Sequence, residues 1–382
     1  MRFDDMDKIP FNRTHLTGRE IEFISTAFSS GQITGDGPFT KKCEAWLEKS
    51  TGTPRALLTH SCTAALEMAA LLAGIAPGDE VILPSYTFVS TANAFVLRGG
   101  VPVFIDVRAD TINIDENLIE AAITPRTRAI VPVHYAGVSC AMDEINAIAE
   151  KHNLLVIEDT AQGIGASYRG RALGTLGNLG ALSFHATKNI VSGEGGALLI
   201  NDRMMNERAE IIREKGTDRS RFIRGEVDKY TWQDVGSSFL PSDIIAATLM
   251  AQLPETEAIN ARRLAIWSRY HAAFAEGEQA GRFRRPGVPQ DCGHNAHIYY
   301  LVFNSLDARE QARTTLAEAG IVAATHYVPL HEAPAARRLG RAHGTFAVCD
   351  SVAAGLLRLP LYPDLSSDEQ TRVIEAVQSL QV

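Results

Sequence analysis

The chain has 382 residues, of which 45% are hydrophobic and 21% are charged. These values are typical of a folded globular protein and exclude a disordered chain, a collagen and a coiled coil. The net charge of −8 excludes a broad basic surface, so we expect neither a nucleic acid nor a membrane as partner. At this length two or three domains are expected.

The five cysteines are odd in number and lie far apart in the sequence. Neither they nor His294 and His297 have the spacing of a zinc site, so we predict no metal. Unpaired cysteines favour a reduced, cytoplasmic location. The N-terminal segment 1–12 is polar, unlike a signal peptide, and the longest nearly apolar stretch, 68–77, is too short to cross a bilayer.

The first half of the chain alternates between helical patterns and short apolar runs. Two helices, over 17–28 and 39–47, come first. Strands are then expected at 56–58, 81–83, 103–107, 129–133 and 154–157, and helices at 63–73, 91–97, 116–123 and 142–152. This alternation predicts an α/β fold with a mostly parallel sheet and helices on both faces. Two further runs, 181–184 and 197–200, leave no room for a crossover helix, which predicts an antiparallel strand at one edge.

The second half changes character. A helix is expected over 203–215, and residues 216–238 then form a polar, irregular stretch of the kind that carries function or reaches a partner. A helical pattern covers 242–274, with a break expected at Pro254. Strands at 298–303 and 323–327 and helices at 308–319, 349–357 and 366–380 follow. We therefore predict a large domain over 1–253 and a smaller α+β domain over 254–382.

Three segments that follow apolar strands carry reactive side chains. Asp159 lies in VIEDTAQ (156–162), and Lys188 lies in SFHATKN (183–189), which GEGG follows at 193–196. The third segment, THSCTAA (59–65), starts a helix whose free N–H groups can bind an anion. Taken singly, each has a structural explanation: a solvated strand end, a surface lysine or an ordinary helix cap.

Taken together, these segments indicate a site for pyridoxal phosphate (PLP). A lysine amine forms the Schiff base, a carboxylate keeps the pyridinium protonated, and a helix start holds the phosphate. Phe88 follows another strand and either stacks on the ring or packs in the core. Ligands of open parallel sheets bind at the carboxyl ends of the strands, which is where these residues are expected.

At these motifs the chain resembles the fold-type-I PLP enzymes and, among them, the DegT-type sugar-nucleotide aminotransferases. The matching segments follow the family order along almost the whole chain: GDGPFTKKCE, THSCTAALEMA, PSYTFVSTANAF, VPVHYAG, IEDTAQ, SFHATKN, GEGG, VPLHEAPA and LRLPLYPDL. The resemblance implies a large three-layer α/β/α domain, a smaller C-terminal α+β domain and PLP as cofactor.

The resemblance also assigns roles. Lys188 would bond PLP and move the proton between substrate and cofactor, and Asp159 would pair with the ring nitrogen. The remaining cofactor contacts would come from Gln162 at the ring hydroxyl, Phe88 stacked on the ring, and Cys62, Thr63, Ser183 and the partner subunit's Ser238 at the phosphate. At the position of Ser238 the family often has asparagine, which puts that contact in doubt. Thr160 stands where alanine is frequent, and we expect no consequence.

The family implies a homodimer with active sites at its interface, a nucleotide-sugar substrate and L-glutamate as amino donor. Residues 78–100 and 209–232 are most similar to members that convert dTDP-4-keto-6-deoxy-D-glucose to dTDP-4-amino-4,6-dideoxy-D-galactose for surface polysaccharides. Substrate contacts are expected from the basic loop at 215–224, by Lys215 and Arg219, and from the turn at 327–330, by Tyr327 and the flanking His326 and His331. The alternatives are a solvated charged loop and ordinary core or surface histidines.

Other functions stay open to different degrees. Related enzymes aminate C3 or act on UDP-linked sugars, and the motifs do not separate these from C4 amination. A PLP-dependent sugar dehydratase is disfavoured because such relatives typically lack the lysine that Lys188 provides. A non-catalytic sensor is disfavoured because Lys188, Asp159 and Gln162 are all present. A dinucleotide-binding protein would need GxGxxG after an early strand, and no glycine cluster completes it.

Overall fold

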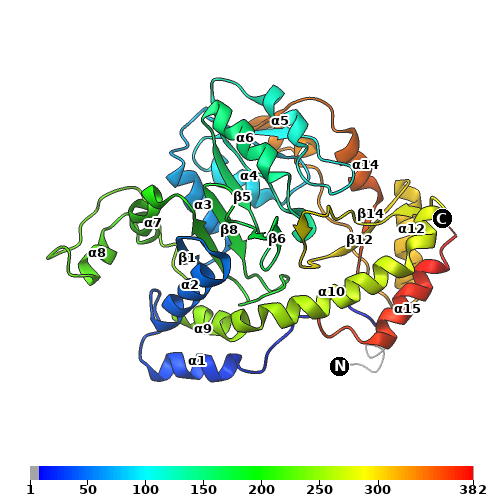
Figure 1. Ribbon diagram of the computed structural model, residues 1–382, viewed down its shortest axis with the longest axis horizontal. Helices are drawn as coiled ribbons and strands as arrows, with labels where there is room; N and C mark the ends of the chain where they lie inside the picture. The colour runs from blue at the N-terminus through cyan, green and yellow to red at the C-terminus, as the bar shows by residue number, and fades with distance from the viewer. Residues whose placement is uncertain (1–7, 382) are drawn as a thin grey trace.

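The computed structural model describes residues 8–381, so most of the N-terminal segment discussed above lies outside the described residues. Its centre is an eight-stranded sheet (Figure 1). The strand order is β1 (Arg55–Thr59), β9 (Gly196–Ile200), β8 (Leu179–Ser183), β5 (Leu155–Asp159), β4 (Thr127–Ile130), β2 (Glu80–Pro84), β3 (Val101–Ile105) and β13 (Arg341–Ala342).

All neighbouring strands of this sheet are parallel except β9, which is antiparallel to both β1 and β8. The predicted, mostly parallel sheet is therefore confirmed. The antiparallel strand was predicted at the edge of the sheet, but β9 lies one place in from the edge, which β1 forms. The difference arises because β1 pairs with the side of β9 that β8 leaves free, through five residue pairs from Arg55↔Ile200 to Thr59↔Gly196.

Helices cover both faces of the sheet because apolar side chains of each strand alternate between the faces. Leu57 points to one face, where α3 (Cys62–Leu72), α4 (Val89–Val96), α7 (Asn206–Arg213) and α14 (Ala347–Gly355) pack. Ala56 and Leu58 point to the other, against α2 (Pro38–Thr51) and α9 (Asp243–Gln252). Farther along that second face lie α5 (Glu116–Ala122) and α6 (Met142–His152). α1 (Glu20–Ser29) packs on α9.

The long helical pattern predicted over 242–274 is confirmed, including its break. Ser242 caps α9 by accepting a hydrogen bond from the Ile245 N–H, and a short 3-10 turn, Leu253–Glu255, contains Pro254. α10 (Thr256–Ala273) continues beyond it. Figure 1 shows α9 and α10 running nearly in line along one side of the molecule, which links the large sheet to the C-terminal part.

A separate apolar core lies in the C-terminal part. A three-stranded antiparallel sheet of β10 (Phe283–Arg284), β12 (Tyr299–Phe303) and β14 (Leu356–Leu359) packs with α10, α12 (Leu306–Glu318) and α15 (Ser367–Gln378). However, β13 belongs to the large sheet, so the C-terminal part also contacts the first half. The boundary between residues 253 and 254 stays a prediction.

The prediction of a strand at 323–327 is wrong. Only Ala324 pairs there, in an isolated bridge with Arg358, and the chain then turns so that His326 and Tyr327 reach the cavity described below. The strand lies instead at β14, at the end of the segment predicted as helical over 349–357. Gly355 ends the helix there, and a Cβ at this position would lie 2.1 Å from the Phe303 carbonyl oxygen, so only glycine allows this approach.

The remaining elements are short. They are α8 (Arg219–Ile223), α11 (Ala275–Gln279), α13 (Ala336–Leu339) and a small sheet of β11 (Cys292–Gly293), β6 (Ser167–Tyr168) and β7 (Arg171–Ala172). Among residues 8–381, no helix combines the length and the apolar character needed to span a membrane. The cysteines, all within this range, are free thiols.

Candidate active site

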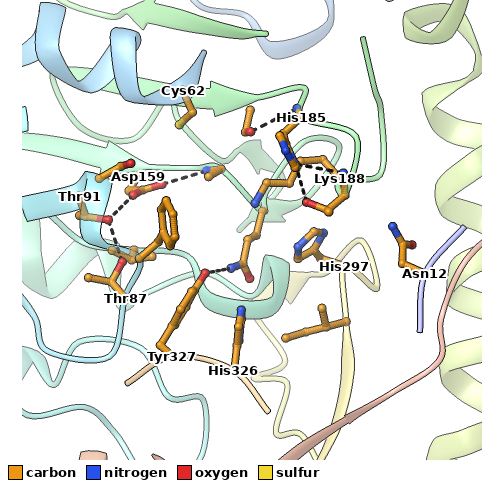
Figure 2. Close-up of a pocket in the computed structure, with 18 of the residues that line it drawn as sticks. Asn12, Cys62, Thr87, Thr91, Asp159, His185, Lys188, His297, His326 and Tyr327 are labelled. Carbon is orange, nitrogen blue, oxygen red and sulfur yellow. Dashed lines mark hydrogen bonds between the residues drawn. The ribbon is translucent and has the colours of Figure 1, made fainter. Parts of the chain in front are cut away.

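A cavity of about 510 Å³ opens at the carboxyl ends of the parallel strands, where the C-terminal part of the chain faces the large sheet. Most of the predicted site residues line it, from the ends of different elements. They are Cys62, Thr63, Phe88, Asp159, Gln162, Ser183, Lys188, His326 and Tyr327. Figure 2 shows Cys62, Asp159, Lys188, His326 and Tyr327 around the same space.

Lys188 lies on the loop between β8 and β9, where its backbone N–H donates to the His185 carbonyl at 2.9 Å. Its side chain is partly accessible from the cavity and makes no hydrogen bond or ion pair to residues 8–381. Burial lowers the pKa of the Lys188 ammonium below its usual value, although the Cys62 and Asp159 side chains act in the opposite direction. A lysine with a lowered pKa is suited to react as a free amine.

Asp159 ends β5, and its carboxylate is held by two donors. The Thr91 hydroxyl donates to Oδ2 at 2.7 Å, and the Ala161 N–H donates to Oδ1 at 3.1 Å. Thr91 in turn lies 2.8 Å from the Thr87 hydroxyl, and all three side chains are buried. Because the carboxylate only accepts, Thr91 must donate to Asp159 and Thr87 must donate to Thr91. This relay, visible in Figure 2, fixes the direction in which Asp159 faces the cavity.

The start of α3 forms an anion-binding cradle. Ser61 caps the helix by accepting from the Ala64 N–H at 3.0 Å, which leaves the N–H groups of Cys62 and Thr63 at the cavity wall. Gly196 packs directly behind them, since a Cβ there would lie 2.5 Å from the Cys62 nitrogen. The Thr63 hydroxyl donates to Ser90 at 2.8 Å, and Ser183 lines the same wall. These donors suit a phosphate.

Gln162, Tyr327 and His326 form a connected wall. The Gln162 side chain accepts from the Ala136 N–H at 2.7 Å and donates to the Tyr327 hydroxyl at 3.0 Å. The His326 ring stacks on Tyr327 at 3.7 Å between centroids, and its Nδ1 lies 2.7 Å from the Tyr135 hydroxyl. Burial lowers the pKa of His326 well below its usual value, so this ring is neutral at neutral pH.

Phe88 immediately precedes α4, and its side chain is 56% exposed, which rules out core packing. It lines the cavity, 6.3 Å from the Tyr327 ring between centroids. An exposed aromatic ring at the mouth of a cavity is available for stacking on a flat ligand. Its role in stacking on the cofactor ring stays a prediction.

Three predicted contacts lie outside the cavity of their own chain. Lys215 is exposed between α7 and α8, and Arg219 forms an ion pair with Glu214 at 3.1 Å. Ser238 is exposed and pairs with the backbone of Glu214. None of the three lines the cavity, so their contacts with a substrate or cofactor stay predictions.

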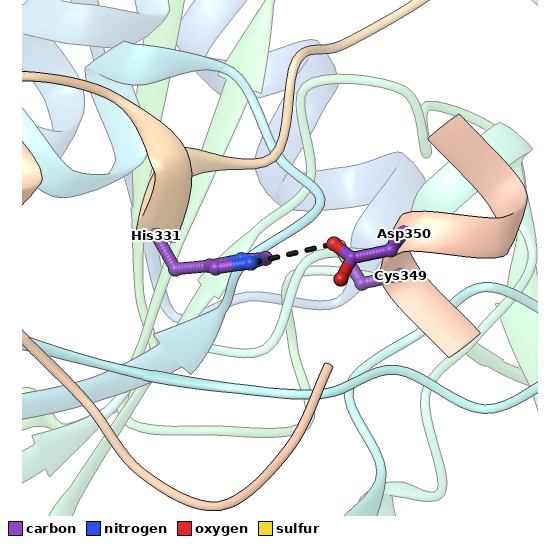
Figure 3. A group of neighbouring side chains, drawn as sticks. All are labelled: His331, Cys349 and Asp350. Carbon is purple, nitrogen blue, oxygen red and sulfur yellow. Dashed lines mark ion pairs between the residues drawn. The ribbon is translucent and has the colours of Figure 1, made fainter. Parts of the chain in front are cut away.

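His331 also lies outside the cavity. Its Nδ1 is 2.7 Å from the Ser85 hydroxyl, its ring stacks on Phe346, and its Nε2 is 3.3 Å from the Asp350 carboxylate (Figure 3). The side chain of Cys349 lies close by, and His331, Cys349 and Asp350 each offer one atom that could bind a metal ion, all within 4.8 Å of one another. These contacts hold the turn at 330–332 against Ser85 and leave His331 turned away from the cavity.

Sequence reasoning missed several cavity residues, among them Thr91, which holds Asp159, and His297, Arg263 and Arg358. The Asn189 amide donates to Asn260 and to the Asn295 carbonyl, so its oxygen must accept from His297 Nδ1, at 2.9 Å. His297 Nε2 is then an acceptor. His297 was considered only as a zinc ligand, and its place just before an apolar strand was the signal that it lies at a strand end.

Residues 15–378 match the model of the DegT/DnrJ/EryC1/StrS aminotransferase family. The chain belongs to this family. It is 35% identical over 380 residues to the spore coat polysaccharide biosynthesis protein SpsC of Bacillus subtilis, with 97% of each chain covered.

Solved structures agree with this aminotransferase assignment. The PLP form of Spr1654 from Streptococcus pneumoniae is 29% identical, with a TM-score of 0.89 and 98% of each chain covered. DesV of Streptomyces venezuelae is 31% identical, with a TM-score of 0.89, and the match covers 99% of this chain and 100% of DesV. The aminotransferase is a PLP-dependent enzyme with the fold-type-I architecture.

The cavity of the aminotransferase fits PLP by its own chemistry. It combines an amine of lowered pKa at Lys188, a fixed carboxylate at Asp159 and a helix start with free N–H groups at Cys62 and Thr63. These correspond to the aldehyde, the ring nitrogen and the phosphate of the cofactor. Gln162 lines the same cavity as Asp159, and its contact with the ring hydroxyl stays a prediction.

Proposed function

We propose that this aminotransferase uses Lys188 as its cofactor-bonding lysine and proton carrier, with Asp159 at the pyridine nitrogen. The observation that carries the proposal is the meeting of an unpaired lysine, a doubly held aspartate and an open helix start in one cavity. When bound, PLP supplies an aldehyde that accepts an amine from one substrate and a ring that accepts electrons.

The chain's own side chains would then do three things. Asp159, held by Thr91, would keep the ring nitrogen protonated. Cys62, Thr63 and Ser183 would bind the phosphate at the start of α3, with Phe88 over the ring face. Lys188 would carry the proton at its Nζ, and its lowered pKa supports this because the neutral amine is the form that accepts a proton.

For substrates we propose L-glutamate and dTDP-4-keto-6-deoxy-D-glucose, giving 2-oxoglutarate and dTDP-4-amino-4,6-dideoxy-D-galactose. The resemblance of residues 78–100 and 209–232 to members with that activity supports this choice. A relative named for spore coat polysaccharide biosynthesis supports a role in surface polysaccharides. Activated sugars and free thiols both fit a cytoplasmic enzyme.

We further propose a homodimer in which the segment 216–238 reaches the partner's cavity. Figure 1 shows α8 standing away from the body of the molecule. Large apolar side chains of the segment 216–238 are exposed, as expected of a surface that a second copy covers: Phe222, Ile223, Tyr230, Trp232 and Val235. Trp232, 81% exposed, is the most prominent. Light scattering should give the mass of two chains, and a Trp232→Ser variant should shift the equilibrium toward one.

The substrate proposal is tested by incubating the enzyme with L-glutamate and a panel of dTDP- and UDP-linked keto sugars. NMR of the product identifies the aminated carbon and its stereochemistry. Amination at C4 of the dTDP-linked sugar alone supports the proposal. Amination at C3, or a preference for UDP-linked sugars, would replace it with the corresponding alternative. Loss of a hydroxyl without amine transfer would indicate a dehydratase.

A further inference from the structure

A cluster of metal-binding side chains lies outside the cavity, between the turn at 330–332 and the first turn of α14 (Figure 3). His331 comes from the turn, and Cys349 and Asp350 are neighbours on α14. A ring nitrogen, the thiol sulfur and a carboxylate oxygen all lie within 4.8 Å of one another. The proposed transamination uses none of these three side chains.

The contact between His331 and Asp350 is longer than a direct hydrogen bond of this kind. His331 Nε2 lies 3.3 Å from the Asp350 carboxylate. Tetrahedral zinc, with bonds of about 2.0–2.2 Å to nitrogen and oxygen, holds two such ligand atoms about 3.3–3.5 Å apart. In the described chain, three other histidines hydrogen-bond a carboxylate with their closest atoms 2.8 Å apart: His15 with Asp364, His134 with Glu158 and His152 with Glu120. The spacing of His331 and Asp350 therefore suits two ligands of one ion better than a direct pair.

The Ser85 hydroxyl leaves Nε2 of His331 as the nitrogen that a metal can reach. Its oxygen accepts from the His331 backbone N–H at 3.1 Å and lies 2.7 Å from Nδ1. A metal on Nε2 needs the ring proton on Nδ1, and the second lone pair of the Ser85 oxygen can accept it there. Histidine ligands commonly donate their other N–H in this way, which fixes the ring. Stacking on Phe346, with 3.8 Å between centroids, holds the same ring from its face.

Cys349 is fixed through its backbone and is reachable from solvent along Asp350. The buried Asp106 carboxylate accepts from the N–H groups of Val348 at 3.0 Å and Cys349 at 2.8 Å, which holds the start of α14. Burial raises the pKa of the Cys349 thiol, while a hydrogen bond from Ser85 acts in the opposite direction, so a metal has to displace the thiol proton. The Asp350 side chain beside it is 51% exposed, which gives an ion a route from solvent.

We propose that His331, Cys349 and Asp350 form a zinc site that ties the turn at 330–332 to α14, with water as the fourth ligand. Imidazole, thiolate and carboxylate are the donors that Zn²⁺ takes, whereas Mg²⁺ and Ca²⁺ take oxygen ligands. The thiolate and the carboxylate together balance the charge of the ion. Ligand atoms of tetrahedral zinc lie about 3.3–3.7 Å apart, so side-chain shifts of about 1 Å close the site.

The prediction of no metal from the sequence concerned ligand spacing along the chain. The three ligands proposed here come from two segments that only the fold brings together. The proposal is independent of the proposed function, because no ligand lines the cavity and the tests below do not measure transamination.

The first test is calorimetry with Zn²⁺ on the chelator-treated, cofactor-bound enzyme. We expect one Zn²⁺ per chain in the wild type. Loss of a partner behind a ligand costs about 10- to 100-fold in metal affinity, so Cys349→Ser and Asp350→Asn, which each change a ligand itself, should lose at least about 100-fold. Asp350→Asn alters an exposed position and serves if the buried Cys349 variant fails to fold. Cys292→Ser removes another free thiol, on β11, and should bind Zn²⁺ like the wild type.

Co²⁺ in place of Zn²⁺ gives an independent readout of the sulfur ligand. The difference spectrum against metal-free holoenzyme should show thiolate-to-cobalt charge transfer in wild type and in Cys292→Ser, and none in Cys349→Ser. Zn²⁺ should also raise the melting temperature of the wild type and leave that of Cys349→Ser unchanged. Zn²⁺ binding no tighter in the wild type than in Cys349→Ser would overturn the proposal, and so would a cobalt complex without thiolate absorption or a loss of binding in Cys292→Ser.

Discussion

The relay from Thr87 through Thr91 to Asp159 makes a quantitative prediction about the catalytic carboxylate. In Thr91→Val the side chain keeps its shape, and its β-branched rotamer still suits the first turn of α4. Only the hydroxyl that donates to Asp159 Oδ2 at 2.7 Å is removed. Asp159 can then turn away from the cavity, because the Ala161 N–H is its sole remaining donor among the described residues.

The size of the effect follows from the bond that is lost. A hydrogen bond to a charged group is worth about 1.5–3 kcal/mol. If that energy holds Asp159 against the ring nitrogen, kcat/KM should fall by about 10- to 100-fold. Thr87→Val acts one bond farther away and should cost only about threefold. Thr91→Val also leaves the buried Thr87 hydroxyl without its partner, which should cost about 1–2 kcal/mol of stability.

Thr160 provides a matched control for this experiment. It follows Asp159 directly, is fully buried, and its hydroxyl has no hydrogen-bond partner in the described part of the chain. Thr160→Val makes the same chemical change next to the same aspartate. It should leave kcat/KM unchanged and raise the melting temperature slightly. The assay is steady-state turnover together with PLP affinity. Equal activity of Thr91→Val and wild type would refute the relay, and equal losses in Thr91→Val and Thr160→Val would show only general damage.

Three further predictions concern stability and the cavity wall. Burial alone would raise the pKa of Glu80, but hydrogen bonds from Arg341 and other neighbouring side chains lower it to about 2. The ionised Glu80 therefore stabilises the fold above the usual pKa of 4.5, and this contribution is lost as the pH falls through about 2. Glu80→Gln should therefore cost about 3 kcal/mol at neutral pH by urea unfolding, and a difference that persists at low pH would contradict this. Burial lowers the pKa of Lys188, so below the usual value of 10.5 the unfolded chain binds more protons at this lysine than the folded chain does. The cofactor-free Lys188→Met protein should therefore have a higher melting temperature than cofactor-free wild type at neutral pH. This difference should close as the pH approaches 10.5. Tyr327→Phe removes the hydroxyl that accepts from Gln162 and should lower kcat/KM about three- to tenfold, whereas an unchanged rate would show that Gln162 is held without it.

Much of the large sheet could be predicted from the sequence because its strands are short, apolar and separated by clear helical patterns. The same logic placed Asp159 at the end of a strand and Lys188 in the loop that follows one. The strand predicted at 323–327 failed because an apolar run does not show that its backbone has a partner along its length. There, only Ala324 pairs.

The substrate contacts were harder to predict because charge alone does not say what a charge faces. The basic loop was predicted to bind substrate because its positive residues are clustered in the sequence. In the structure its arginines form ion pairs with Glu207, Glu210 and Glu214. Arg358 lies alone in an apolar strand, and the sequence does not show that it faces a cavity. His297 was set aside with His294 for lack of zinc spacing, although it lines the same wall.

The central claim is that Lys188 bonds the cofactor, and trapping that bond is its most direct test. The holoenzyme is reduced with borohydride, digested, and its peptides are analysed by mass spectrometry. We predict that the cofactor mass lies on the peptide that contains Lys188, and that Lys188→Ala neither traps the cofactor nor turns over. Cofactor fixed to another lysine, or transamination by Lys188→Ala at the wild-type rate, would contradict the account.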